Sequence, residues 1–187
     1  MPEDFKKKTD EQLYDLLSGN KDLARIAFDE LYYRYSTKIF TYCRKVLNNL
    51  DIAEDIFQET FTRFYESSRT ERKMTNVAGF IIKIARNLCL NEKSKRLHDK
   101  VQNKFTHISY IETSFERQEL SELIDRALES LPETYREALV LKEFLDMSYK
   151  EIAEILGSTL PIIRIRIYRA KNKLREFLTP YLKDLQS

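Results

Sequence analysis

The chain has 187 residues, of which only three are glycine, four are proline and two are cysteine, and its formal net charge is +2. This length accommodates one domain or two small ones, and the scarcity of glycine and proline beside abundant helix formers predicts an all-α protein. Cys43 and Cys89 lie far apart without CxxC spacing, which argues against a disulfide framework and a zinc site. We expect both cysteines to be buried as small hydrophobic residues.

The sequence lacks the run of about 18 apolar residues that a membrane span needs, and its amino terminus lacks the apolar stretch of a signal peptide. We therefore expect a cytoplasmic protein without membrane insertion. Its charges are segregated: residues 51–59 carry four acids and no base, whereas residues 160–178 carry six bases and one acid. A second basic zone covers residues 83–104. This segregation predicts at least two partners of opposite charge.

The first two-fifths of the chain show helical periodicity. Apolar residues recur every four positions at Leu23, Ala27, Leu31, Tyr35 and Ile39, and the pattern resumes at Ile52, Ile56, Thr60 and Phe64, with Phe57 and Phe61 beside it. Residues 66–76 lack periodicity and predict a loop. Residues 77–96 predict another helix, apolar at its start and basic at its end. Together these helices predict a compact domain over residues 1–96.

Polar, aperiodic sequence follows over residues 97–118 and predicts a flexible linker. The second predicted domain, 119–187, contains three helix signals. Pro132 suits the first turn of one helix, and Ser148 with Glu151 forms a capping box for the next. Gly157 ends that helix, and Thr159 can cap the last one. A short helix, a tight glycine-containing turn and a longer basic helix are typical of a helix-turn-helix.

The last helix has a core face and an outward face. A helical wheel gives Ile163, Ile167, Ala170, Leu174 and Phe177 the core face, with Ile162 at its border. Outward-facing arginines suit guanine edges or phosphates, and Ile165 suits a thymine methyl. The alternative is a solvated surface helix, but the capped helix before it favours DNA. The candidates for contact with duplex DNA are Thr159, Pro161, Arg164, Ile165, Arg166, Tyr168, Arg169, Lys171, Asn172 and Lys173.

The carboxy-terminal stretch "LPETYREALVLKEFLDMSYKEIAEILGSTLPIIRIRIYRAKNKLREFL" resembles region 4 of extracytoplasmic-function sigma factors, the small group IV subunits of bacterial RNA polymerase. The amino-terminal "AFDELYYRYSTKIFTYCRKVLNNLDIAEDIFQETFTRFYE" and "FIIKIARNLCLNEKSKR" resemble region 2 of the same family. Both regions occur in the family's order, separated by a linker. The resemblance implies two small helical domains, one resembling the region 2 bundle and one the region 4 helix-turn-helix.

In this family an acidic helix with the motif AEDIxQExF docks on a coiled coil of the core polymerase. The resemblance, together with helical spacing, gives the polymerase-binding candidates Asp51, Glu54, Asp55, Gln58, Glu59 and Thr62. Carboxylates at i and i+4, such as Asp55 and Glu59, can also share a metal ion. No histidine or further acidic cluster accompanies this pair, so we expect neither a metal site nor an enzyme. A solvated acidic face is the stronger alternative.

The helix over residues 77–96 resembles the element that recognises and melts the minus-ten promoter element, and the loop before it the one that captures a flipped base. An unstacked base needs stacking surface and hydrogen-bond donors, and a freed strand needs cations. Phe80 stands where the family usually has tryptophan, and Ile165 where it often has a small polar residue. The minus-ten candidates are Arg69, Arg72, Met74, Asn76, Phe80, Lys83, Arg86, Asn87, Lys93 and Arg96.

The resemblance predicts a sigma factor that directs promoter recognition and transcription initiation in response to an envelope or extracellular signal. Its implied partners are core RNA polymerase, promoter DNA as duplex and as non-template single strand, and an anti-sigma factor that can hold it at the inner face of the membrane. No cofactor is expected, because strand capture opens the DNA. Two alternatives stay open: a non-sigma helix-turn-helix regulator, and a polymerase-binding protein without promoter-opening activity.

Overall fold

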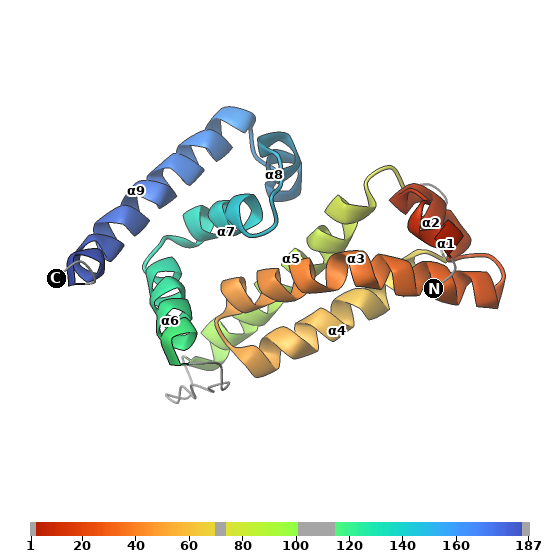
Figure 1. Cartoon of the computed structure of the whole chain (residues 1–187), viewed down its shortest axis with the longest axis horizontal. Coiled ribbons are helices and arrows are strands. Elements are labelled where there is room, and N and C mark those ends of the chain that lie inside the picture. Colours follow the sequence, from red (N-terminus) through yellow and green to blue (C-terminus); the bar gives the residue numbers. More distant parts are fainter. Residues whose placement is uncertain (1–2, 70–73, 101–114, 185–187) are drawn as a thin grey trace. The chain divides into compact units, whose positions relative to one another are not determined.

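The computed structural model describes residues 3–69, 74–100 and 115–184, and every regular element within these ranges is an α-helix (Figure 1). The all-α prediction is therefore confirmed. The helices are α1 (Glu3–Lys6), α2 (Asp10–Leu16), α3 (Lys21–Leu47), α4 (Leu50–Ser67), α5 (Val77–Lys100), α6 (Phe115–Glu129), α7 (Glu133–Glu143), α8 (Tyr149–Leu156) and α9 (Leu160–Asp184). They form two compact units. The first comprises α1 to α5 apart from residues 44–49, and the second comprises α6 to α9 together with residues 44–49.

The helices that flank the expected linker extend into it from both sides. α5 continues beyond Arg96 to Lys100, and α6 already begins at Phe115. The segment between them, residues 101–114, lies outside the described residues. The linker predicted over residues 97–118 therefore includes the last turn of α5 and the first turn of α6.

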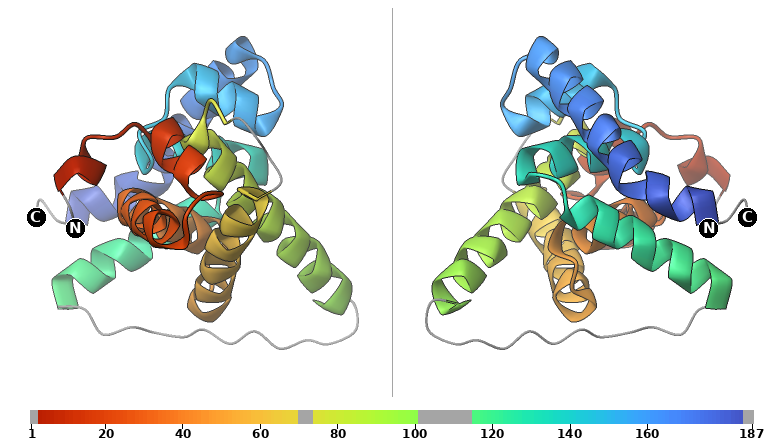
Figure 2. Two further views of the ribbon diagram at one scale, coloured as in Figure 1. Left: turned by 90° about the vertical axis from the view of Figure 1, so that its right-hand side faces the viewer. Right: turned by 90° about the vertical axis from the view of Figure 1, so that its left-hand side faces the viewer.

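The core of the first unit is built by α3, α4 and α5, which appear in orange, gold and green in both views of Figure 2. Ala27, Leu31 and Ile39 of α3 are fully buried, as their four-residue spacing predicts. Leu23, in the first turn of α3, is exposed instead. α4 packs against α5, and it buries Phe64, among others, in the interface. This packing leaves the opposite side of α4 accessible.

Aromatic rings from two other helices pack against Phe64. Its ring centroid lies 5.7 Å from that of Tyr14 on α2 and 6.3 Å from that of Phe80 on α5. Phe80 therefore helps to pack α5 onto the unit through its ring.

Cys43 and Cys89 are both buried, as expected for small hydrophobic residues.

Arg34 on α3 binds the amino-terminal segment to the first unit. Its guanidinium donates to the Glu30 and Asp10 carboxylates at 2.8 and 2.7 Å. It also donates to the backbone carbonyl oxygens of Lys8 and Lys6 at 3.0 and 3.1 Å. A planar group with five donors can satisfy all these acceptors at once, which lysine cannot. The start of α2 is thereby held against α3.

The second unit contains the predicted helix-turn-helix. α8 begins with a complete capping box between Ser148 and Glu151 and ends at Gly157, which adopts the left-handed conformation with φ 57°. α9 starts immediately after Thr159, whose carbonyl oxygen accepts a hydrogen bond from the Ile163 amide at 3.0 Å. These features confirm the capping box and the glycine stop.

α9 packs against α7 and α8 through the face that the wheel predicts. Ile163 and Ala170 are fully buried and Ile167 nearly so, while Leu174 and Phe177 are half-buried. Figure 1 shows α9 as one long helix that continues well beyond this packed region. Because one face is fixed by the core, the outward residues of the helix have a defined orientation.

Candidate functional site

One face of α4 presents the acidic residues that the sequence analysis grouped. Asp51, Glu54 and Asp55 are exposed, which gives this face its negative charge. Glu59 is half-buried, and its Oε1 accepts a hydrogen bond from Arg63 Nε at 2.6 Å. Gln58 and Thr62 are also exposed, and the Thr62 hydroxyl donates to the Gln58 carbonyl oxygen at 3.1 Å.

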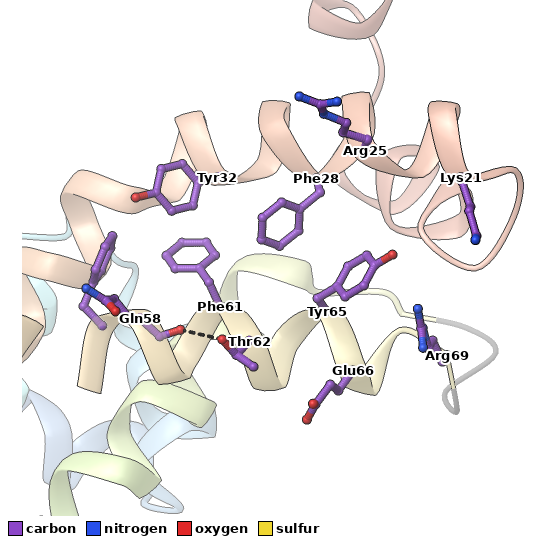
Figure 3. Close-up of a pocket in the computed structure, with 11 residues that line it drawn as sticks. Lys21, Arg25, Phe28, Tyr32, Gln58, Phe61, Thr62, Tyr65, Glu66 and Arg69 are labelled. Carbon is purple, nitrogen blue, oxygen red and sulfur yellow. Dashed lines mark hydrogen bonds between the residues drawn. The ribbon is translucent and has the colours of Figure 1, made fainter. Parts of the chain in front are cut away.

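An aromatic groove lies beside this face, between α3 and α4 (Figure 3). Phe28 and Tyr32 come from α3, and Phe57, Phe61 and Tyr65 come from α4. The Tyr32 and Phe61 ring centroids are 4.8 Å apart, and those of Phe28 and Tyr65 are 5.5 Å apart in an edge-on arrangement. Although Tyr32 belongs to this cluster, 40% of it remains exposed. The groove therefore offers apolar ring surface to a partner.

Polar side chains surround the aromatic groove. Gln58 and Thr62 line it from α4, so two of the predicted polymerase-binding residues belong both to the acidic face and to the groove. Lys21 and Arg25 line it from α3, and Arg69 lines it near the end of α4. Figure 3 shows Lys21, Arg25 and Arg69 at the periphery of the rings. Glu66 lines the groove as well, so charges of both signs lie around an apolar centre, an arrangement common at protein interfaces.

α5 carries most of the residues expected at the minus-ten element. Lys83 and Asn87 are exposed, whereas the other members of the set on this helix are half-buried, namely Phe80, Arg86, Lys93 and Arg96. Arg96 lies 3.7 Å from Glu92 one turn before it. The cations are distributed along several turns of one helix, which suits contact with an extended strand.

The loop before α5 contributes three described candidates. Arg69 is exposed and lies over the Tyr65 ring at 5.3 Å, and Met74 is half-buried. The Asn76 side chain accepts a hydrogen bond from the Gly79 amide at 2.8 Å, so its carbonyl oxygen caps α5. Arg72, the fourth candidate, lies outside the described residues.

Gly79 permits this cap. A Cβ atom at position 79 would lie 2.7 Å from the side-chain nitrogen Nδ2 of Asn76, which is closer than real Cβ atoms approach. The absence of a side chain at Gly79 therefore lets Asn76 fold over the start of α5. Because its carbonyl oxygen is engaged, Asn76 retains mainly its NH2 group for a ligand.

The outward face of α9 carries the candidates for duplex contact. Two of them, Arg166 and Asn172, are half-buried. The remaining ones are exposed: Thr159, Pro161, Arg164, Ile165, Tyr168, Arg169, Lys171 and Lys173. The helix thus gathers cations and apolar side chains on a single accessible surface.

Three of the cations on α9 are held by residues of α7 and of α8. Arg169 donates to the Tyr135 hydroxyl oxygen at 3.2 Å, and this bond raises the pKa of Arg169. Lys171 lies 2.9 Å from the Glu143 carboxylate, whose hydrogen bond raises the pKa of Lys171. The Arg164 guanidinium lies 5.9 Å from the centre of the Tyr149 ring, within cation–π range. These partners restrict the directions in which the cations point.

The restraining residues on α7 and α8 and the groove residues of α3 could not be identified from local sequence patterns. Tyr135 and Glu143 belong to α7, and each meets a cation about thirty positions away along the chain. Phe28 and Tyr32 meet α4 at a similar separation. Local spacing rules carry no signal for such pairs, because only tertiary packing brings them together.

Neither a metal cluster nor a spanning helix is found within the described ranges. No three histidine, cysteine, aspartate or glutamate side chains there gather in the way that metal coordination requires. None of the described helices combines the length and the hydropathy that a bilayer crossing demands.

Comparison with known proteins assigns both halves of the chain. Residues 31–97 match the family Sigma-70 region 2, and residues 121–174 match the family Sigma-70, region 4. The ECF RNA polymerase sigma factor SigW of Bacillus subtilis (strain 168) is 31% identical over 169 residues, which cover 81% of this chain and 89% of the relative. RNA polymerase sigma factor YlaC of the same organism is 28% identical over 166 residues, 83% of this chain and 94% of the relative.

Solved structures agree on the fold. The sigma factor RpoE, solved with the anti-sigma factor NepR from Bartonella quintana, is 22% identical with a TM-score of 0.71, covering 81% of this chain and 96% of that one. CnrH, solved with the cytosolic domain of CnrY, is 22% identical with a TM-score of 0.68, covering 91% and 97%. A non-sigma helix-turn-helix regulator is not favoured, because both sigma regions match in one chain and in order. The chain belongs to the extracytoplasmic-function family of RNA polymerase sigma factors.

Proposed function

We propose that the protein binds core RNA polymerase and directs it to promoters that carry two separate elements. The observation that carries this proposal is the presence in one chain of an acidic face beside an apolar groove and of a basic helix-turn-helix. The first surface suits a basic protein partner, and the second suits DNA. The role needs no covalent chemistry from the chain and no cofactor.

The proposed polymerase interface consists of the acidic face of α4 and the aromatic groove. Asp51, Glu54 and Asp55 attract a basic partner, and exposed charge of this kind mainly accelerates and orients association. The aromatic rings supply the desolvated surface that contributes most of the affinity of protein complexes. Gln58 and Thr62 belong to both parts, so a single helical partner can contact them together.

The proposed minus-ten surface consists of α5 and the loop before it. Lys83 and Asn87 face solvent and are available to a displaced strand. Cations along the helix neutralise strand phosphates, and Arg69 and Met74 supply donors and polarisable surface for an unstacked base. We expect strand capture, rather than a nucleotide cofactor, to open the duplex.

The proposed upstream surface is the amino-terminal half of α9. Helix-turn-helix proteins insert this part of the recognition helix into the major groove. Arg164 and Arg169 are candidates for guanine edges or phosphates, while Lys171 and Lys173 suit phosphates further along the backbone. Because α7 and α8 restrain three of these cations, less side-chain entropy is lost on binding.

We also propose that an anti-sigma factor restrains the protein until an envelope or extracellular signal releases it. The support is the likeness in fold to RpoE and CnrH, whose structures were solved with NepR and with a cytosolic domain of CnrY. In this proposal the protein resides in the cytoplasm, either free or held at the inner face of the membrane by that partner.

One binding experiment distinguishes this proposal from a non-sigma regulator and from a polymerase-binding protein without promoter opening. The three differ in whether enrichment of each DNA element requires core polymerase. Core enzyme, the purified chain and both together are mixed with a library of duplexes that carry random upstream and minus-ten elements. A sigma factor enriches both elements at a fixed spacing only when core enzyme is present. A non-sigma regulator enriches one element without core enzyme. A polymerase-binding protein without promoter opening binds core enzyme and enriches no minus-ten element.

A further inference from the structure

Three apolar side chains form a strip along the outward surface of α9. Ile162 is 43% exposed, Ile165 is 50% exposed and Tyr168 is 67% exposed. We call these three residues the apolar strip. The opposite side of the same turns is fixed in the core by Ile163 and Ile167, so the strip cannot turn inward. It lies in the first turns of a helix that begins at Leu160.

Packing within the second unit does not explain the apolar strip. The stabilisation from burying an apolar side chain scales with the area removed from water, so half-exposed isoleucines gain much less than fully buried ones. Threonine, serine or lysine at positions 162 and 165 would therefore cost the fold little. Two exposed isoleucines spaced three residues apart, in company with Tyr168, instead form a contiguous apolar surface.

The cations beside the apolar strip are held toward the body of the unit. Arg164 lies over the Tyr149 ring, and Arg169 is hydrogen-bonded to Tyr135. The apolar strip thus lies beside guanidinium groups whose directions are restrained. This arrangement matches a duplex groove, in which phosphates line the edges and base edges lie at the centre.

The chemistry of the major groove decides what the apolar strip can contact. The C5-methyl group of thymine is the apolar group that the major-groove edges of the bases present, and side chains read it by apolar contact. Residues three apart on a helix have Cβ atoms about 5–6 Å apart, and base pairs stack at about 3.4 Å. Ile162 and Ile165 can therefore contact thymines at neighbouring or next-neighbouring positions.

We propose that Ile162 and Ile165 determine the specificity of the upstream element by packing on two thymine methyl groups, with Tyr168 covering one side of the contact. The proposal rests on the proposed upstream surface of α9 and deepens it. It states that the element contains two thymines close together. It also states that these positions are read by shape and apolar contact rather than by hydrogen bonds.

Deoxyuridine tests this proposal, because it differs from thymidine at the base only by the missing methyl group. Holoenzyme made from the full chain and core enzyme first selects an upstream element from a random library. Each thymine of that element is then replaced in turn by deoxyuridine, and holoenzyme affinity is measured for the natural chain, Ile162→Ser and Ile165→Ser. Leu120→Ala, which changes an exposed aliphatic residue of α6, is the control.

We expect deoxyuridine at two nearby positions to weaken binding by the natural chain about fourfold each, the value of one buried methyl group. Each serine variant should lose a similar factor and become insensitive to deoxyuridine at one of these positions, while Leu120→Ala keeps the natural pattern. If holoenzyme selects an element and opens it, yet ignores every methyl group, the apolar strip serves another purpose, such as docking a protein, and the proposal is overturned. If no upstream element is selected, the proposed function of α9 fails as well.

Discussion

Arg169 on α9 donates a hydrogen bond from Nη1 to the hydroxyl oxygen of Tyr135 on α7 at 3.2 Å. The bond joins a candidate DNA contact to a residue that is half-buried on a neighbouring helix. A guanidinium that is held in one direction loses less freedom when it binds a base or a phosphate. Tyr135 is thereby predicted to act on DNA through Arg169.

Tyr135→Phe removes only the hydroxyl group and should weaken binding to the upstream element by about 0.5–1.5 kcal/mol, the usual contribution of one hydrogen bond. Arg169→Ala should cost roughly 1–3 kcal/mol if the arginine contacts a base. Fluorescence anisotropy of the holoenzyme on labelled promoter DNA measures both. In the double variant the effect of Tyr135→Phe should disappear, since no arginine remains to be oriented. Additive effects would show that Tyr135 acts independently.

Charge reversal on α4 should weaken binding to core polymerase. Asp55→Lys and Glu59→Lys remove attraction and add repulsion, so we expect a loss of roughly 1–3 kcal/mol each that is largest at low salt. Asp15→Lys, at an exposed position on α2, is the matched control and should bind as the natural chain does. Titration of labelled core enzyme at two salt concentrations measures the affinities. If Asp15→Lys lost as much affinity for core polymerase, the change in net charge alone would explain the effect.

The aromatic groove offers a second, independent test of the polymerase interface. Tyr32 lies in the groove against Phe61, whereas its neighbour Tyr33 is exposed and does not line it. Tyr32→Ala should reduce core binding by about 2 kcal/mol, as for an aromatic residue at the centre of an interface. Tyr33→Ala should leave it unchanged. Surface plasmon resonance on immobilised core enzyme compares the two, and a larger loss for Tyr33→Ala would exclude the groove from the interface.

Gly157, in the turn before α9, is expected to contribute to the stability of the second unit. Gly157 has φ 57°, and a Cβ atom there would meet nothing within 4 Å, so only backbone strain opposes a side chain. Gly157→Ala should destabilise the second unit by about 1–2 kcal/mol, and Gly157→Asn by less, because asparagine tolerates this conformation. Hydrogen exchange of the α8 and α9 amides measures the change locally. Unaltered protection in Gly157→Ala would contradict the prediction.

Local sequence patterns were sufficient to predict the helix-turn-helix. The Ser148–Glu151 capping box, the glycine stop and the buried stripe through Ile163 and Ile167 each depend on residues within a few positions of one another. The wheel also assigned Ile165 correctly to the outward face. Ile162 was expected at the border of the core, and its 43% exposure shows that the border lies closer to Ile163.

Features that depend on tertiary packing could not be predicted from such local patterns. Phe57 and Phe61 were expected only beside the apolar pattern of their helix, but their rings also line a groove with Phe28 and Tyr32 of another helix. The partners of Arg169 and Lys171 were likewise unpredictable, because the helices that carry them are separate in sequence. Family resemblance predicted the surfaces as wholes, whereas the residue pairs within them depend on tertiary packing.

Transcription from a promoter library shows whether the chain directs core polymerase to promoters. Core polymerase and the full chain are incubated with templates that carry random upstream and minus-ten elements, and the 5′ ends of the transcripts are sequenced with their templates. We expect transcripts that start at a fixed distance downstream of two enriched elements, and only when the chain is present. Stable binding of the chain to core polymerase without any such transcripts would contradict the proposed function.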